Sequence, residues 1–285
     1  MSELAVRGEN GPRTFWRSDS APAVWSEARL ARDVHWRRVA TGVDLAELTL
    51  AGTGEAWRTR LVVVRLDPSQ VSLSLDTALT RKGEPAWKIA RAPRAAVFAV
   101  NAGQFRSLPW GQVILDGRQI LPPEHGPLAM TLAIDSVGGV HWTFDGQPPA
   151  SHVAWAFQSY PVILREHAVP SALQGTNRGL DVAHRDARLA LGRLESGALI
   201  VALTRFEGLG AAFGSVPFGL TVPEMAAVMG SLGATDAVLL DGGISAQLVA
   251  GDGKNRVTYR GWRDVPLALI ARPVRRAGQA GLRNR

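Results

Sequence analysis

The 285-residue chain contains no cysteine, and this absence excludes three kinds of chemistry. Disulfide bonds, thiolate metal sites and thiol nucleophiles all require cysteine. The absence does not decide the compartment, because many exported proteins also lack cysteine.

Long apolar runs are also missing. No stretch approaches the roughly 18 apolar residues of a membrane span. The first twenty residues, MSELAVRGENGPRTFWRSDS, contain no apolar core of the length that a signal peptide needs. We therefore expect no membrane span, and whether an export signal has been removed stays open.

Several catalytic signatures are absent as well. The six histidines are scattered, with no H-x-H or H-x-x-x-H pair, so the sequence does not indicate zinc. There is no G-x-S-x-G elbow and no P-loop. We expect no cofactor and assign no metal ligand. A divalent cation such as calcium, held by carboxylate and backbone oxygens, is left open.

The composition is that of a folded domain, with 46% apolar and 20% charged residues and a net charge of +7. No linker interrupts the chain, so we predict an irregular segment over 1–34, one domain over 35–271 and a basic flexible tail over 272–285. The tail could solubilise the protein or bind nucleic acid. No RNA-binding aromatic signature or zinc-finger spacing supports the second alternative, so we expect no nucleic-acid partner.

Short β-branched or alternating runs predict many strands. They cover residues 45–51, 60–66, 71–75, 95–100, 160–164, 237–240 and 265–271. Three further pairs of runs flank turns at 116–117, 138–139 and 195–197, which predicts three hairpins. Residues 85–92 suggest a short helix. The pattern predicts an α+β fold, a mixed and largely antiparallel sheet core with a few flanking helices.

The best-marked element is a helix after Thr221. Thr221 and Glu224 match a T-x-x-E capping box, and Gly233 is the expected stop. Apolar residues at helical spacing predict one buried face: Met225, Val228, Met229 and Leu232.

Asp241 directly follows the apolar residues VLL. Gly242 and Gly243 allow positive φ and a close approach to a ligand, and Ser245 adds a hydroxyl. A carboxylate at the end of a buried strand, in a glycine-rich turn, is often presented in a cleft. The alternative is a purely structural Asp-Gly turn, as at Asp116, and an isolated motif leaves both open.

Asn101 also ends an apolar run, AAVFAV, and is followed by Ala102-Gly103. Its amide could bond a sugar hydroxyl or orient a carboxylate. The alternative is an Asx-turn that satisfies only the local backbone.

Arg188 precedes another apolar run. A guanidinium binds phosphate through two parallel hydrogen bonds. Arg188 could instead form a surface ion pair with Asp186, and the neighbouring Arg185 could take its role. His184 lies close enough in sequence to be a substrate-binding residue, or it is an exposed loop histidine.

Nine tryptophans are many for this length, and Trp110 follows closely on the Asn101 turn. Aromatic faces stack on sugar rings, so Trp110 is a candidate platform for a sugar. Core packing is the alternative.

Three segments carry a resemblance to a known family: Asn101 to Phe105 (NAGQF), Arg188 to Gly192 (RLALG) and the block Gly219 to Gln247. In this order they resemble the phosphodiester glycosidase family, with looser similarity over about 43–270. Two positions depart from the family's pattern. Ile244 replaces a common glycine, and Gln104 replaces an aromatic or small residue.

The resemblance implies a hydrolase that cleaves the anomeric bond of a sugar-1-phosphodiester and releases a free sugar and a phosphomonoester. Asp241 would stabilise the cationic transition state or activate water. Arg188 would bind the phosphate, and Asn101 and Ser245 would orient the substrate, beside Gly103, Gly242 and Gly243. The second carboxylate stays open between Asp76, Asp116, Asp181 and Glu207.

The resemblance also implies a glycan or sugar-phosphate substrate, an extracytoplasmic location, and kinship with bacterial exopolysaccharide-related proteins. The oligomeric state stays open. The alternative is a non-catalytic glycan-binding or envelope-assembly protein of the same fold. Ile244, which would narrow the turn, and the unassigned second carboxylate favour that alternative.

Overall fold

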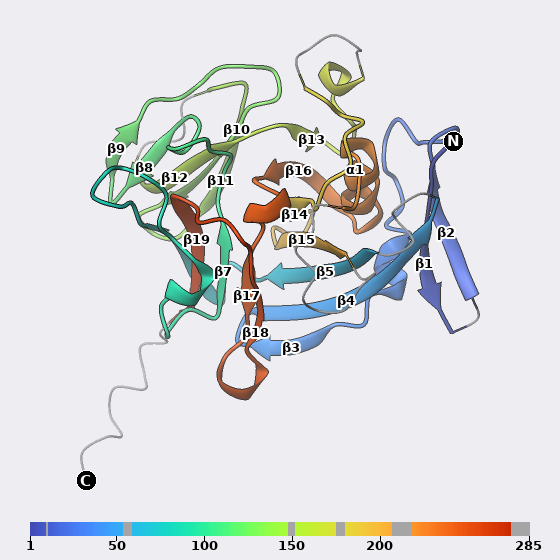
Figure 1. Ribbon diagram of the computed structural model, residues 1–285, viewed down its shortest axis with the longest axis horizontal. Coiled ribbons are helices and arrows are strands. Elements are labelled where there is room, and N and C mark those ends of the chain that lie inside the picture. Colours follow the sequence, from blue (N-terminus) through green and yellow to red (C-terminus); the bar gives the residue numbers. More distant parts are fainter. Residues whose placement is uncertain (10, 54–58, 148–151, 175–179, 207–217, 275–285) are drawn as a thin grey trace.

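Three β-sheets form the framework of the described chain, and every strand pairing in them is antiparallel (Figure 1). The computed structural model describes residues 1–9, 11–53, 59–147, 152–174, 180–206 and 218–274.

The largest sheet has nine strands. Eight follow in the spatial order β13 (Val162–Leu164), β16 (Ala234–Leu240), β14 (Leu189–Leu194), β15 (Leu199–Phe206), β5 (Thr59–Leu66), β4 (Val43–Gly52), β1 (Glu3–Gly8) and β2 (Gly11–Arg17), and β3 (Arg37–Ala40) pairs with β4.

The other two sheets have five strands each. One has the order β11 (Val140–Phe144), β10 (Met130–Asp135), β12 (Val153–Ser159), β8 (Val113–Leu115) and β9 (Arg118–Leu121). The other has the order β18 (Val257–Tyr259), β17 (Leu248–Ala250), β7 (Phe98–Asn101), β19 (Leu267–Pro273) and β6 (Val71–Thr77).

The predicted hairpins are confirmed as β8–β9, β10–β11 and β14–β15. The fold is richer in strand than the α+β prediction, because α1 (Val222–Ser231) is the single α-helix of the described residues. The helix predicted at 85–92 was wrong: Trp87 forms a β-bridge with Val265, and only Ile89–Arg91 makes a 3₁₀ turn. Pro93 disfavours helical geometry in the residue before it.

The prediction of an irregular segment over 1–34 was also wrong. β1 and β2 form a hairpin, and β1 pairs with β4 at the margin of the large sheet. Its residues Leu4, Ala5 and Val6 are buried, and burial of this short apolar run stabilises a strand in otherwise polar surroundings. At the other end, β19 continues through Pro273. The rest of the predicted tail, 275–285, lies outside the described residues.

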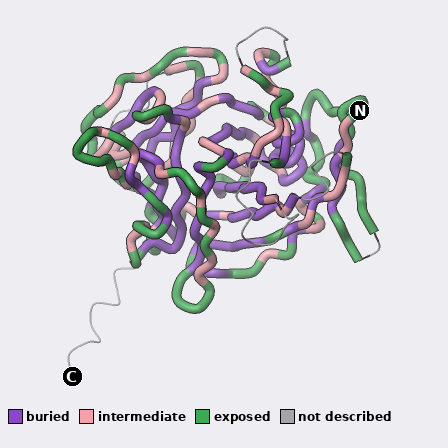
Figure 2. Tube along the Cα trace, viewed as in Figure 1, coloured by how far each residue is buried: buried purple, intermediate pink, exposed green. Residues whose placement is uncertain are grey.

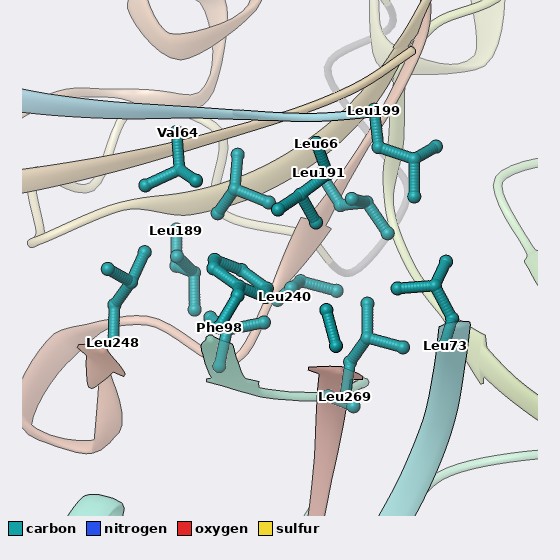
Figure 3. Packing of buried hydrophobic residues seen from close by; sticks show 14 of the residues in the cluster. Val64, Leu66, Leu73, Phe98, Leu189, Leu191, Leu199, Leu240, Leu248 and Leu269 are labelled. Carbon is teal, nitrogen blue, oxygen red and sulfur yellow. The ribbon is translucent and has the colours of Figure 1, made fainter. Parts of the chain in front are cut away.

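The central strands of the large sheet are buried on both faces, which explains their continuous apolar runs. Along β5, Val62 and Val64 pack into one core cluster, whereas Leu61 and Val63 pack into another on the opposite face. The first cluster joins the large sheet to the smaller ones (Figure 3). The second lies between the sheet, α1 and the N-terminal segment. Figure 2 shows the central strands as buried and many of the connecting loops as exposed.

The helix α1 begins and ends as predicted. The Glu224 backbone N–H donates to Thr221 Oγ1 at 3.3 Å, and the Thr221 N–H donates to Glu224 Oε2 at 2.9 Å, which forms the capping box. Gly233 has a φ of +90° just past the helix end. α1 packs on β13, β14 and β16. No helix in the described part of the chain is both long and apolar enough to cross a membrane.

Candidate active site

The two predicted glycine turns meet because of one strand pairing. The Asp241 turn leaves β16 of the large sheet and leads into β17 of a smaller sheet. β17 pairs with β7, with Leu248 opposite Val100, and β7 ends at Asn101. The pairing therefore brings together turns that are distant in sequence (Figure 1).

Direct hydrogen bonds join the two turns. Asn101 Nδ2 donates to the Asp241 carbonyl at 2.6 Å, and Asn101 Oδ1 accepts from the Gln247 backbone N–H at 3.0 Å. The Asp241 N–H donates to the Gly103 carbonyl at 3.0 Å. The Asn101 side chain is 1% exposed. It binds the backbone of the other turn and does not form the Asx-turn that was the structural alternative.

The segment before β14 completes the arrangement. β14 pairs with β16, with Leu189 opposite Leu240, so Arg188 continues this register opposite Asp241. The Gly243 N–H donates to the Ala187 carbonyl at 2.7 Å. The backbones at Asn101, Arg188 and Asp241, the three predicted catalytic residues, thus converge on one place.

The Arg188 guanidinium, however, is directed toward backbone carbonyls near α1. Its Nε donates to the Leu220 carbonyl at 2.8 Å, and its Nη2 donates to the His184 carbonyl. Among the described residues no ion pair joins Arg188 to Asp241. Burial lowers the Arg188 pKa, whereas the nearby Asp186, Asp181 and Glu224 raise it.

Glycine is needed in both turns for space as well as for conformation. Gly103 has a φ of +69°, and a Cβ there would lie 2.8 Å from the Gln158 carbonyl oxygen. A Cβ at Gly242 would collide with the Ala187 carbonyl, and Gly243 has a φ of +57°. A side chain at any of these positions would therefore displace the segments that surround Asp241.

Asp241 is a partly buried carboxyl group with a perturbed pKa. Burial raises the pKa to about 6, and the negative charge of Asp186 adds to the rise. A hydrogen bond from Ser245 and the positive charge of Arg263 act in the opposite direction. Asp241 Oδ2 is buried and has no hydrogen-bond partner among the described residues. An unpaired buried carboxylate oxygen is costly, and such groups concentrate at functional sites.

Asp186 is the second carboxyl group of the candidate site. From the sequence alone it was considered only as an ion partner of Arg188. Its Oδ1 accepts from the Ala187 N–H at 2.8 Å. Its Oδ2 lies so near Gly243 that a Cβ on that glycine would be 2.9 Å away. Burial raises the Asp186 pKa, and Arg188 and His184 partly offset the rise. The sequence pattern that could have pointed to Asp186 is its position two residues before Arg188.

Three of the four carboxylates predicted as candidates have surroundings of their own. Asp76 accepts from Trp87 Nε1 at 3.1 Å, and Asp116 is an exposed hairpin residue with a φ of +48°. Asp181 accepts two backbone N–H groups in its own loop. Glu207 lies outside the described residues.

The remaining predicted site residues differ in their surroundings. Ser245 is 2% exposed and bonds the Asp241 carboxylate. His184 is exposed and contributes its carbonyl to Arg188. Trp110 is half-buried, with its ring centroid 4.3 Å from that of Tyr160. The Ile244 side chain is 40% exposed, so it forms surface next to Asp241 and does not fill the turn.

The capping residue of α1 supports the site from behind. The buried Glu224 carboxylate receives two hydrogen bonds from Arg185, at 2.7 and 2.8 Å. Arg185 precedes Asp186, which forms a β-bridge with Leu220. The alternative role for Arg185, phosphate binding, is not supported by this geometry, because its guanidinium is held by a buried carboxylate.

No group of three or more histidine, aspartate or glutamate side chains in the described part of the chain could hold a metal ion. The chemistry that the residues themselves offer is that of two carboxyl groups with raised pKa values. They lie beside cationic side chains, in an arrangement suited to acid–base or electrostatic catalysis.

The described residues thus form an antiparallel β-fold with a carboxyl group, Asp241, between a strand of the large sheet and a strand of a smaller one. The family model of the phosphodiester glycosidases matches residues 92–272, more than half of the chain, and the chain belongs to that family. No curated protein sequence matches the chain.

Solved structures share the fold. The catalytic domain of zebrafish N-acetylglucosamine-1-phosphodiester alpha-N-acetylglucosaminidase, auto-inhibited by its pro-peptide, superimposes with a TM-score of 0.58. The match covers 95% of this chain and 87% of that chain at 14% identity. A hypothetical protein from Synechocystis matches with a TM-score of 0.52 and 13% identity, over 95% of this chain and 68% of that one. At these identities the likeness concerns the fold alone.

Proposed function

We propose that this protein hydrolyses the bond between the anomeric carbon and the bridging oxygen of a sugar-1-phosphodiester. Water adds to the anomeric carbon, and the bridging oxygen leaves with the phosphate. The products are a free sugar and a phosphomonoester. Family membership supports the reaction class, and the site supports it with the Asp241 carboxyl group at the junction of the two turns, whose Oδ2 is buried and has no partner among the described residues.

Asp241, in its ionised form, would stabilise the positive charge that develops on the sugar ring or accept a proton from the attacking water. A phosphodiester is a good leaving group, so strong help from a general acid is less necessary than for an ordinary glycoside. Asp186 would be the second carboxyl group. Burial is the main cause of the raised Asp241 pKa, and the negative charge of Asp186 adds to it.

The other residues have supporting roles in this proposal. Asn101 is a positioning residue, since both ends of its amide bond the backbone around Asp241. Ser245 would orient the Asp241 carboxylate, and Gly103, Gly242 and Gly243 allow the close approach of the three segments. Trp110 and His184 remain candidates for contacts with the sugar or its aglycone. The assignment of the phosphate to Arg188 also stays a prediction.

The test is turnover of a panel of sugar-1-phosphate methyl diesters, beginning with N-acetylglucosamine, the sugar of the zebrafish enzyme. Release of reducing sugar and of phosphomonoester is measured for the wild type, for Asp241→Asn and for the control Asp116→Asn. Asp116 also begins an Asp-Gly turn, but in the exposed β8–β9 hairpin.

We expect Asp241→Asn to lose roughly 10²- to 10⁴-fold in kcat with its circular dichroism unchanged, and Asp116→Asn to match the wild type. Full activity in Asp241→Asn would refute the proposal. A wild type that binds glycans without forming any product would favour the alternative, a glycan-binding protein of the same fold.

A further inference from the structure

Arg263 connects the two turns of the site, and the sequence analysis did not select it. We propose that Arg263 is the guanidinium that binds the phosphate of the substrate, and that Arg188 is a positioning residue. The inference rests on the proposed function for the identity of the substrate. The anion site itself can be tested without turnover.

The backbone of Arg263 is fixed to the Asp241 turn. Its N–H donates to the Ile244 carbonyl at 3.1 Å, and its carbonyl accepts from Gln247 Nε2 at 3.4 Å. Gln247 is buried, and its backbone N–H donates to Asn101. Gln247 therefore bonds both the loop that carries Arg263 and the Asn101 side chain that joins the two turns.

The side chain of Arg263 reaches the other turn. Its Nη2 donates to the Arg106 carbonyl at 3.0 Å, and its Cζ lies 4.8 Å from the ring centroid of Phe105. Phe105 and Arg106 follow the Asn101-Ala-Gly corner after one residue, Gln104. Stacking on an aromatic ring holds a guanidinium in one plane and leaves its edge accessible for a bidentate contact with an oxyanion.

The hydrogen-bonding capacity of Arg263 is largely unused. A guanidinium has five N–H donors, and among the described residues only the Arg106 carbonyl accepts from this one. The side chain is exposed, and its acidic neighbour Asp264 pairs with Lys88 at 3.2 Å. A phosphate group would therefore supply acceptors for the guanidinium donors that have no acceptor among the described residues.

Arg188 differs on each of these points. Two of its nitrogens bind backbone carbonyls, and the three carboxyl groups of Asp186, Asp181 and Glu224 act on its charge. The protein itself thus holds the Arg188 guanidinium in place and compensates its positive charge. Arg263 is the cation that acts on Asp241, because its positive charge lowers the Asp241 pKa. Because the Arg263 N–H is bonded to the Ile244 carbonyl, a phosphate bound to Arg263 would lie beside the turn that carries Asp241.

The experiment measures the binding of inorganic phosphate by isothermal titration calorimetry to the wild type and four variants. These are Arg263→Gln, Arg263→Lys, Arg188→Lys and the control Arg118→Gln, which changes an exposed arginine on β9. We expect Arg263→Gln to weaken binding about tenfold or more, Arg263→Lys to weaken it less, and the other two variants to remain within about twofold of the wild type.

With a sugar-1-phosphodiester as substrate, the loss in Arg263→Gln should appear mainly in KM. Unchanged phosphate affinity in Arg263→Gln would overturn the inference, as would a larger loss in Arg188→Lys or no binding to the wild type at millimolar phosphate. Turnover distinguishes this failure from that of the proposed function. If the wild type binds phosphate through Arg263 but cleaves no diester, only the proposed function fails.

Discussion

The side chain of Asn101 is hydrogen-bonded to the backbone of Asp241, 140 residues further along the chain. Nδ2 donates to the Asp241 carbonyl, while Oδ1 accepts from Gln247 beyond the turn. One buried amide therefore helps to hold the ends of β7 and β16 together, in addition to the pairing of β7 with β17 and the bond from the Asp241 N–H to the Gly103 carbonyl.

Asn101→Ala should consequently reduce both stability and activity. It leaves a buried carbonyl and a buried N–H without partners, each at a cost of about 1–3 kcal/mol. We expect a lower urea midpoint and at least a tenfold loss of kcat/KM. Asn255→Ala, at an exposed asparagine of the η7 turn (Gly253–Asn255), is the control and should change neither. An Asn101→Ala protein with wild-type stability would show that the bridge contributes little.

Activity should rise with pH through about 6, because the ionised form of Asp241 is the active one in our proposal and burial raises its pKa to about 6. The groups that act on it are Ser245, Arg263 and Asp186. The measurement is kcat/KM between pH 4 and 9. A kcat/KM that falls as the pH rises through 6 would instead assign Asp241 the role of a general acid.

The same pKa predicts how stability depends on pH. The folded-state pKa of Asp241 lies above its ordinary value of 3.8, so the folded state holds the proton more tightly. The stabilisation is present below about pH 4 and is lost as pH rises through 6. Asp241→Asn removes this titration. The free energy of unfolding of Asp241→Asn, relative to that of the wild type, should rise by on the order of 2 kcal/mol between pH 4 and pH 8, measured by urea unfolding. A constant difference in free energy would contradict the buried, unpaired state of the carboxyl group.

Asp186→Asn should shift the rising limb of the pH profile toward lower pH, because it removes a negative charge that raises the Asp241 pKa. Arg188 and His184 also act on Asp186, so the histidine titration should be followed by NMR in the same samples. A merely structural role for Asp186 would lower kcat without moving the limb. An unmoved limb would therefore show that the two carboxyl groups are not coupled.

Gly103→Ala tests the space in the Asn101 turn. Gly103 and Gly83 both have positive φ, but only at Gly103 would a Cβ meet a neighbour, the Gln158 carbonyl oxygen. Left-handed geometry costs a non-glycine residue roughly 1–2 kcal/mol, so Gly83→Ala measures that cost alone. We expect Gly103→Ala to be at least 1 kcal/mol less stable than Gly83→Ala, with a much larger loss of activity. Equal effects would mean that the turn can open without cost.

Local chemistry made much of the fold predictable. The capping box at Thr221 and Glu224 and the stop at Gly233 specify α1 through contacts within a few residues, and the three hairpins are specified by their turns. The N-terminal strands β1 and β2 were missed, because β1 is stabilised by pairing with β4, which lies far along the chain. Residues 85–92 were misread for the same reason, since Trp87 pairs with Val265.

The candidate site shows the same division. The glycine turns at Asn101 and Asp241 could be read from the residues, because a polar residue at a strand end followed by glycine is a local pattern. The second carboxyl group of our proposal, Asp186, could not, because it was not among the four candidates and its position against Gly243 is a contact of the folded chain. The choice between Arg188 and Arg263 as the phosphate ligand depends likewise on which guanidinium already has hydrogen-bond acceptors within the folded protein.

The amino-acid sequence alone determined the local elements and the membership of the chain in the phosphodiester glycosidase family. These depend on residue types at short spacings. The tertiary structure decided which charges act on Asp241. Asp186 approaches it through the pairing of β14 with β16, and the loop of Arg263 is bonded to the turn between β16 and β17. Electrostatic interactions and burial depend on distances in space, and the spacing of residues along a chain does not fix those distances.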